Sequence, residues 1–344
     1  MAAYGKHFDS SEARHLALTS VASLRGNIRG PNAARFARTV GIGAATGVGS
    51  IIYSLCVLSE MLGNRDLIDD AFRACRLLTD DLVAADQQLD VFGGTAGAIL
   101  GLMKLYSLTE EPEVLARAEH CATHLLKTAR QGSPGARSWS GLEGTEPWAG
   151  FSHGAAGIAY SLMRLSTLAQ NEDLETAANE CLAYDALLYS ESHDDWPTGM
   201  NSTAIVEGDD WNCQWCHGAG GIGLSRIGIS RAKKGSDKGN TEIDSCVRAV
   251  LKAWPYPVDT LCCGNLGNVE FLREAASELN RPDLSNISTA RLVGVLRAAA
   301  TRGDYLWTNG NGKSNVGLFR GIAGVGYVSL RELSRNYPNI LLWE

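Results

Sequence analysis

The sequence contains no apolar stretch of the roughly 18 residues that a membrane-spanning helix requires. Its first residues, MAAYGKHFDSSEARH, lack the apolar core of a signal peptide. Lys and Arg are not in excess, since the formal net charge of the 344 residues is -7. Nucleic acids and anionic membranes bind clustered basic side chains. These absences predict a cytoplasmic protein with no nucleic-acid partner and no stable membrane insertion.

Cysteine is scattered along the chain, and the nine residues make an odd number. A disulfide-stabilised domain is small and cysteine-dense, so that class of protein is excluded. Cysteines that lie among apolar helical residues are interpreted as buried reduced thiols, namely Cys56, Cys75, Cys121, Cys181 and Cys246. The other four lie beside glycines in loop-like sequence, namely Cys213, Cys216, Cys262 and Cys263.

Glycine recurs in one phrase that precedes an apolar segment. The six copies are GAATGVG from Gly43, FGGTAG from Phe92, SHGAAG from Ser152, CHGAGG from Cys216, CCGNLG from Cys262 and FRGIAG from Phe319. Five copies share Gly-x-x-Gly. The leading glycines, counted from Gly47 in the irregular first copy, are 46 to 64 residues apart by subtraction. Such spacing is typical of a repeated helical hairpin with variable loops.

The segments between the phrases have helical periodicity, and strand signals are sparse. In PEVLARAEHCATHLLKTAR, for example, Leu115, Ala118, Ala122 and Leu125 share one helical face. Each repeat is therefore interpreted as an apolar helix entered through the glycines and followed by an amphipathic helix. Such hairpins, stacked in a closed ring, predict an all-α fold, an α/α toroid; an open helical solenoid is the alternative.

Three connections are too long to be simple turns, and loops of this length in a compact domain are usually functional. They cover about 132–150, 193–214 and 305–317. They contain Trp139, Trp148, Trp196, Trp211 and Trp307. These tryptophans are predicted either to grip a peptide or to cap the core.

Alignment of the phrases on their leading glycines indicates a metal site. Cys216 and Cys262 both lie two residues before that glycine, and Cys263 follows at once. Equivalent positions in a ring of hairpins point to one end of the barrel, so these thiols can meet although 46 residues separate the first two. Zinc takes thiolate ligands in a tetrahedron, and catalytic sites keep one position open. The pattern predicts one zinc ion that is bound by the three cysteines and activates a thiol.

Other interpretations of the same cysteines remain open. Cys213 forms a C-x-x-C pair with Cys216, so four thiolates could build a closed structural site. Cys262 and Cys263 do not repeat that spacing. His217 could replace one cysteine as a ligand, or the cysteines could bind no metal.

The position directly before the leading glycine holds a histidine in two further repeats, His153 and His217. Histidine titrates near neutral pH and suits proton transfer, so His153 is predicted to be a catalytic acid or base. A structural hydrogen-bonding role is the alternative. Asp90, four residues before Gly94, is predicted either to orient His153 or to cap the phrase that follows it.

In this order, the segments LDVFGGTAG, GFSHGAAG, WCHGAGG, LCCGNLG and GLFRGIAGVGY resemble the signature phrases of lanthipeptide (lantibiotic) cyclases. The resemblance covers nearly the whole chain. The paired Cys262 and Cys263 and the ending YPNILLWE are similar to the C-terminal cyclase domain of class II bifunctional lanthipeptide synthetases. The resemblance implies a single LanC-like cyclase domain over residues 1–344.

In this family the fold is an α/α toroid and the reaction is a zinc-dependent ring closure. A peptide cysteine adds to dehydroalanine or dehydrobutyrine, which gives lanthionine or methyllanthionine. The implied partners are a dehydrated precursor peptide and a dehydratase domain or protein. By motif match the resemblance implies Cys216, Cys262 and Cys263 as zinc ligands, His153 as acid/base, Asp90 as its acidic companion, and Trp215, His217 and Asn212 as substrate-binding residues.

The chain departs from the family pattern near its start. Six phrases are present where the family ring has seven, and residues 3–24 are interpreted as the second helix of a first hairpin whose inner helix is missing. A dehydratase region is also absent upstream. The expectation is a fragment, a split protein or a shortened stand-alone cyclase. His217 stands where some cyclases have tyrosine, and Asn212 where some relatives have a basic residue.

Three functions compete. The first is the cyclase, and the second is a non-cyclising relative that binds zinc and thiols or peptides. The third is a glycosidase on an unrelated helical toroid. A glycosidase needs paired carboxylates in its cavity, and only Asp90 stands out at a repeat phrase, so this function ranks last.

Overall fold

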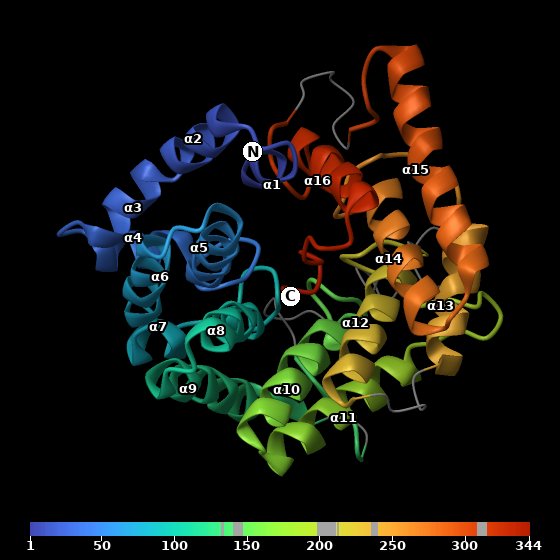
Figure 1. Ribbon diagram of the computed structural model, residues 1–344. Coiled ribbons are helices and arrows are strands. Elements are labelled where there is room, and N and C mark those ends of the chain that lie inside the picture. Colours follow the sequence, from blue (N-terminus) through green and yellow to red (C-terminus); the bar gives the residue numbers. More distant parts are fainter. Residues whose placement is uncertain (132–133, 140–146, 198–210, 212, 235–239, 308–314) are drawn as a thin grey trace. The chain divides into compact units, whose positions relative to one another are not determined.

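The computed structural model describes residues 1–131, 134–139, 147–197, 211, 213–234, 240–307 and 315–344 (Figure 1). This part of the chain is helical except for short connections and one antiparallel pair, β1 (Arg130–Gln131) and β2 (Arg137–Ser138). None of its helices is both long enough and apolar enough to cross a membrane. The chain forms two compact units: unit 1 is Met1–Thr145, Ser161–Ala178 and Trp343–Glu344, and unit 2 is Glu146–Tyr160 and Asn179–Leu342.

Unit 1 alternates apolar and amphipathic helices. Its helices are α1 (Ala2–His7), α2 (Ser11–Ser20), α3 (Ala22–Arg29), α4 (Ala33–Val40), α5 (Val48–Leu62), α6 (Asp66–Arg76), α7 (Asp80–Ala84), α8 (Thr95–Thr109) and α9 (Pro112–Thr128). On α8 every residue from Thr95 to Met103 is buried, whereas α9 buries a single stripe at helical spacing. α8 packs against α5 and α9. The predicted pairing of a buried helix with an amphipathic one is confirmed here.

Unit 2 repeats this alternation. Its helices are α12 (Ala219–Ala232), α13 (Asn240–Lys252), α14 (Asn265–Glu278), α15 (Pro282–Arg302) and α16 (Ile322–Leu333), while α10 (Ala155–Ala169) and α11 (Glu172–Leu187) are divided between the units. α12 and α14 are buried over most of their length, and α14 packs against α12, α15 and α16. α15 buries one stripe, as expected of an amphipathic helix.

The N-terminal stretch differs from the expectation. Residues 3–24 were predicted as one helix, but the chain forms α1, α2 and the start of α3. Asp9 has a left-handed backbone (φ 51°), which ends α1 and its turn. Ser10 then begins a new helix, because its Oγ accepts a hydrogen bond from the N–H of Ala13 at 3.2 Å.

A buried ionic network links α12, α14 and α16. Arg273 and Glu270 on α14 are almost fully buried and pair with each other, and Arg331 on α16 also pairs with Glu270. Glu274 on α14 accepts from Arg331 at 2.8 Å and from Arg231 on α12 at 2.7 Å. Buried charges persist only when they are paired. The network therefore fixes the relative placement of α12, α14 and α16, the helices that follow the last three glycine phrases.

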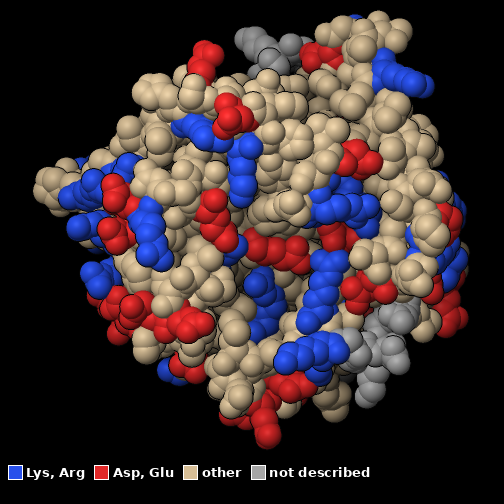
Figure 2. All heavy atoms as spheres, viewed as in Figure 1, with Lys and Arg blue, Asp and Glu red and all other residues tan. Residues whose placement is uncertain are grey.

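Charged side chains of both signs lie on the face drawn in Figure 2. On the face drawn in Figure 2, the acidic and basic side chains of the described residues are interspersed. The nine cysteines, by contrast, are all buried thiols, which confirms the interpretation of the five that lie on helices.

Asp70 on α6 provides the first prediction, which concerns stability. Its fully buried carboxylate accepts from Arg25 Nε at 2.6 Å and from Arg29 Nε at 2.6 Å, both on α3. Replacement of Asp70 by Asn is expected to lower the free energy of unfolding by about 2 kcal/mol, because hydrogen bonds to a charged acceptor are lost. Thermal unfolding of the variant measures the change. The exposed Asp69 on the same helix gives the matched control, Asp69→Asn, with little expected effect.

The effect of Asp70 depends on pH. Burial by itself raises the pKa of Asp70, but hydrogen bonds from Arg29 and Arg25 outweigh it and lower the pKa below the ordinary value of 3.8. A lowered folded-state pKa means that the stabilisation is complete above the ordinary value and is lost as pH falls through the folded value. The difference between wild type and Asp70→Asn should therefore be full at neutral pH and should shrink in acid. A constant difference down to the acid limit would contradict this assignment.

Candidate metal centre

The second glycine of each Gly-x-x-Gly phrase packs a tight turn against the start of an apolar helix. At α12 the N–H of Gly221 donates to the carbonyl of Gln214 at 3.1 Å, and a Cβ on Gly221 would lie 2.0 Å from the Trp215 carbonyl oxygen. At α14 a Cβ on Gly267 would lie 2.4 Å from the Leu261 oxygen. Only glycine fits at such positions. The phrase therefore fixes the path of the turn that contains the cysteines.

Backbone hydrogen bonds join the turns of successive repeats in unit 2. The N–H of Ser152 donates to the carbonyl of Cys216 at 3.3 Å, and the N–H of Cys262 donates to that of Phe319 at 2.9 Å. Each of these four residues lies two positions before the leading glycine of its phrase. Equivalent positions of neighbouring repeats are thus in direct contact, as the glycine alignment predicted.

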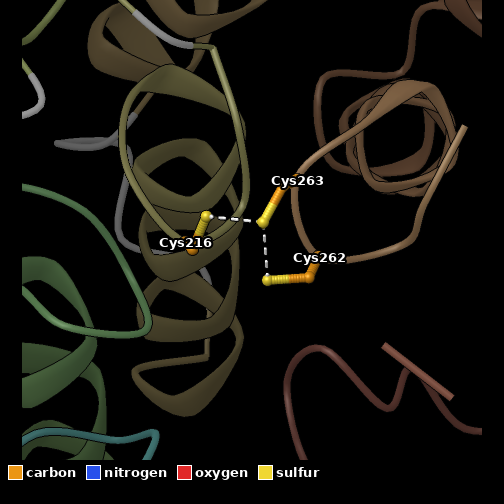
Figure 3. Close-up of side chains that lie close together, drawn as sticks. All are labelled: Cys216, Cys262 and Cys263. Atoms are coloured by element: carbon orange, nitrogen blue, oxygen red, sulfur yellow. Dashed lines mark hydrogen bonds between the residues drawn. The ribbon is translucent and has the colours of Figure 1, made fainter. Parts of the chain in front are cut away.

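The three predicted ligands meet at these turns, with Cys216 before α12 and Cys262 and Cys263 before α14 (Figure 3). The Sγ of Cys263 lies 3.3 Å from that of Cys216 and 3.1 Å from that of Cys262, and all three sulfurs lie within 4.8 Å of one another. Tetrahedral zinc with bonds of about 2.3 Å separates its sulfurs by about 3.8 Å. A small outward shift of the thiols would therefore accommodate the ion, and soft thiolates suit zinc.

The environment of the three cysteines favours negative charge on Cys263. Hydrogen bonds with the thiols of Cys216 and Cys262 lower the pKa of Cys263, burial opposes this, and the neighbouring Arg320 and His217 side chains lower the pKa further. The same hydrogen bonding, with Cys262 and Cys263, raises the pKa of Cys216 well above its ordinary value. Contact among the three thiols therefore favours negative charge within the group, and a thiolate is the form that a metal ion binds.

Cys213 lies outside this group. Its Sγ donates a hydrogen bond to Asp195 Oδ2 at 3.0 Å, and burial raises the pKa of the Cys213 thiol. The group of potential metal ligands found among the described residues contains neither Cys213 nor His217. This arrangement favours a three-cysteine site over the four-thiolate alternative.

The two histidines lie beside each other in unit 2. The rings of His153 and His217 are stacked, with centroids 5.4 Å apart and an interplanar angle of 22°. Trp148 meets His217 edge-on at 5.4 Å and His153 at 6.2 Å. His217 follows Cys216 directly in the chain, so the stacked pair belongs to the same turns as the cysteine group. The turns thus bring together thiols and two groups that can carry protons.

Two of the predicted substrate-binding residues need separate comment. Trp215 is fully buried, and its indole N–H donates to the carbonyl of Leu341 at 3.3 Å. A fully buried ring favours a packing role, and contact of Trp215 with substrate stays a prediction. Asn212 lies outside the described residues. Of the loop tryptophans, Trp139 and Trp196 are also buried, with their indoles bonded to backbone carbonyls, as core-capping residues would be.

Asp90 belongs to unit 1, where it supports its own turn. Its Oδ1 accepts from the N–H of Gly93 at 2.8 Å and from that of Gly94 at 3.2 Å. These bonds match the capping alternative raised by the sequence. A role for Asp90 as the companion of His153 stays a prediction.

Arg320 is a residue of this site that the sequence did not single out. Burial lowers the pKa of Arg320, but the charges of Cys263 and Cys262 and a hydrogen bond with Cys262 outweigh it and raise that pKa. Arg320 stands directly before Gly321, the register that holds His153, His217 and Cys263 in other repeats. The alignment that found the cysteines could have found it as well.

Fold and site together define a class of protein: an all-α protein of repeated helical hairpins with a buried three-thiol centre at the repeat turns. A family model described as "Lanthionine synthetase C-like protein" matches residues 1–342, and the chain belongs to this family. No curated protein sequence matches the chain.

Two solved structures share the fold. One is nisin cyclase, with a TM-score of 0.55 and 13% identity over 97% of this chain and 98% of that one. The other is a sugar epimerase from a ruminal bacterium, with a TM-score of 0.59 and 10% identity over 92% of this chain and 99% of that one. The likeness to nisin cyclase shows the predicted fold class, an all-α toroid.

Proposed function

We propose that the chain is a zinc-dependent cyclase that adds peptide cysteine thiols to dehydroalanine or dehydrobutyrine and so forms lanthionine or methyllanthionine rings. The observation that carries this proposal is the buried group of Cys216, Cys262 and Cys263. Family membership and the likeness to nisin cyclase support it. Because a sugar epimerase has a similar fold, the fold alone does not decide the chemistry, and the thiol group is the feature that favours the cyclase.

The three cysteines would hold one zinc ion. Zinc bound by them would supply thiol activation, because a coordinated thiol is deprotonated near neutral pH and only the thiolate attacks. The three cysteines are at most 9% exposed, so a substrate sulfur bound beside them would be shielded from water. Since the cysteines belong to two turns of fixed path, they would also hold that sulfur in one place.

The addition transfers one proton from sulfur to carbon and forms one carbon–sulfur bond. The peptide thiolate forms a carbon–sulfur bond with the β carbon of the dehydrated residue, the double-bond electrons shift toward the carbonyl oxygen, and the α carbon then takes a proton. We assign that proton to His153, which can receive it from the thiol and return it to carbon. His217, stacked on His153, would donate a hydrogen bond to the developing oxyanion.

The substrate must be supplied by another reaction. A peptide that contains dehydroalanine or dehydrobutyrine arises when water is removed from Ser or Thr. A dehydratase, as a separate protein or a domain, is therefore the partner activity that this function requires.

The test is a ring-closure assay with a synthetic peptide that contains one dehydroalanine and one cysteine. Ring closure leaves the peptide mass unchanged, so the remaining free thiols are alkylated and counted by mass spectrometry. With the zinc-loaded chain, the alkylated fraction should fall well below that of a control without enzyme. A zinc chelator should restore it.

The same assay separates the cyclase from a non-cyclising zinc- and thiol-binding relative. Such a relative would retain the peptide on a column of immobilised protein but leave every peptide thiol alkylatable. That outcome, with zinc present at one ion per chain, would overturn the proposed function.

A further inference from the structure

The turn before α16 places a cation at the cysteine group. The carbonyl of Phe319 accepts from the N–H of Cys262 at 2.9 Å, and the Phe319 ring stacks on Trp215 with centroids 5.4 Å apart. Trp215 adjoins Cys216 in the chain. Phe319 is thus held against both cysteine turns, and the next residue is Arg320, in the same register before its glycine as Cys263.

The guanidinium of Arg320 is directed to sulfur. It interacts with Cys263, Cys262 and Cys216, and with Cys262 it forms a hydrogen bond. Among the residues that the structure describes, Arg320 makes no ion pair with a carboxylate. Arg320 is exposed to solvent. An arginine without an acidic partner beside three thiols is placed to compensate charge that appears on those thiols.

The charge of the loaded site makes such compensation important. Zinc held by three thiolates would give the site a net charge of -1, and a bound substrate thiolate would change this to -2. The three cysteines are buried, and charge in a buried site is costly unless an opposite charge is near. The fixed positive charge of Arg320 halves the excess at the moment when the substrate binds.

We propose that Arg320 is a positioning residue that stabilises the substrate thiolate at the three-cysteine centre, through its charge and its contact with Cys262. The inference rests on the proposed function and adds a specific residue to it. The site would therefore prefer a thiol offered as its anion, and Arg320 would set the affinity for that anion more than the rate of proton transfer.

The experiment measures how a cysteine peptide without any dehydrated residue binds the zinc-loaded chain, by calorimetry, for Arg320→Gln and Arg320→Lys. The Gln variant should bind the peptide about 10-fold more weakly, which corresponds to about 1.4 kcal/mol. The Lys variant keeps the charge and should recover most of the affinity. In the ring-closure assay, the Gln variant should raise KM more than it lowers kcat. Zinc affinity, from competition with a chelator, should change less than peptide affinity.

Arg335→Gln is the matched control. Arg335 lies just after the C-terminal end of α16, whereas Arg320 lies just before its N-terminal end, and Arg335 contacts Ser285. The variant removes the same charge and should leave peptide binding unchanged. Equal peptide affinity in wild type and Arg320→Gln, with zinc bound in both, would overturn the role of Arg320. Ring closure by the wild type would still support the cyclase in that case. If the wild type binds the peptide without any dependence on zinc, the role of Arg320 fails as well. Failure of ring closure alone, with this binding intact, would count only against the cyclase.

Discussion

Replacement of Cys216 by alanine is expected to abolish both zinc binding and ring closure. Cys216 is the single ligand contributed by the turn before α12, and its sulfur lies 3.3 Å from that of Cys263. Loss of a group that merely supports a ligand costs about 10- to 100-fold in metal affinity, so loss of a ligand should cost more than about 100-fold. Zinc content after dialysis and the ring-closure assay measure the two effects.

Cys213→Ala is the matched control for this change. Cys213 is equally buried and lies three residues away, but its thiol is bonded to Asp195. The variant should keep one zinc ion per chain and most of its activity. If Cys213→Ala loses zinc to the same degree as Cys216→Ala, the result would support the closed four-thiolate site. It would then contradict the open coordination position on which the proposed chemistry depends.

Replacement of His153 by asparagine is expected to slow ring closure by about 100- to 10,000-fold, the range that general acid–base groups supply. Zinc content should not change, because His153 is not part of the group of potential metal ligands found among the described residues. Asparagine keeps hydrogen-bonding capacity but cannot carry the proton. The rate of thiol consumption with saturating peptide measures the effect.

His217→Asn serves as the comparison for His153. If His217 only stabilises the developing oxyanion, asparagine can still donate a hydrogen bond, and the rate should fall less than in His153→Asn. A His153→Asn variant with the wild-type rate would contradict the acid/base assignment. Equal losses in both variants would indicate that the stacked pair acts as one unit.

The cysteine group could be predicted from sequence because one turn geometry is repeated. Gly221 and Gly267 leave no room for a Cβ, so residues at a fixed distance before them occupy equivalent places. Alignment of the phrases on their glycines therefore identifies residues that occupy equivalent positions in the structure. The alternation of buried and amphipathic helices follows from the same repetition, since each apolar segment follows a glycine phrase.

Other features depend on contacts that no local pattern contains. Asp195, the partner of Cys213, lies 18 residues earlier in the chain, so the C-x-x-C spacing could not show that the Cys213 thiol has a hydrogen-bond partner outside the cysteine group. The burial of Trp215 depends on the C-terminal segment, whose Leu341 carbonyl accepts its indole N–H. The division of the first helical stretch depends on the left-handed Asp9 and the Ser10 cap, both weaker signals than apolar periodicity. Arg320 was missed because arginine is neither a zinc ligand nor a usual acid/base.

The most direct test of the central claim is to count thiolate ligands in the chain loaded with Co²⁺ in place of zinc. The sulfur-to-cobalt charge-transfer absorption grows with the number of thiolates bound. The account predicts three thiolates in the chain alone and four when a cysteine peptide is added, with no increase for the same peptide carrying serine. Four thiolates before any peptide is added, or three both before and after, would contradict a site in which Cys216, Cys262 and Cys263 activate the thiol of a substrate.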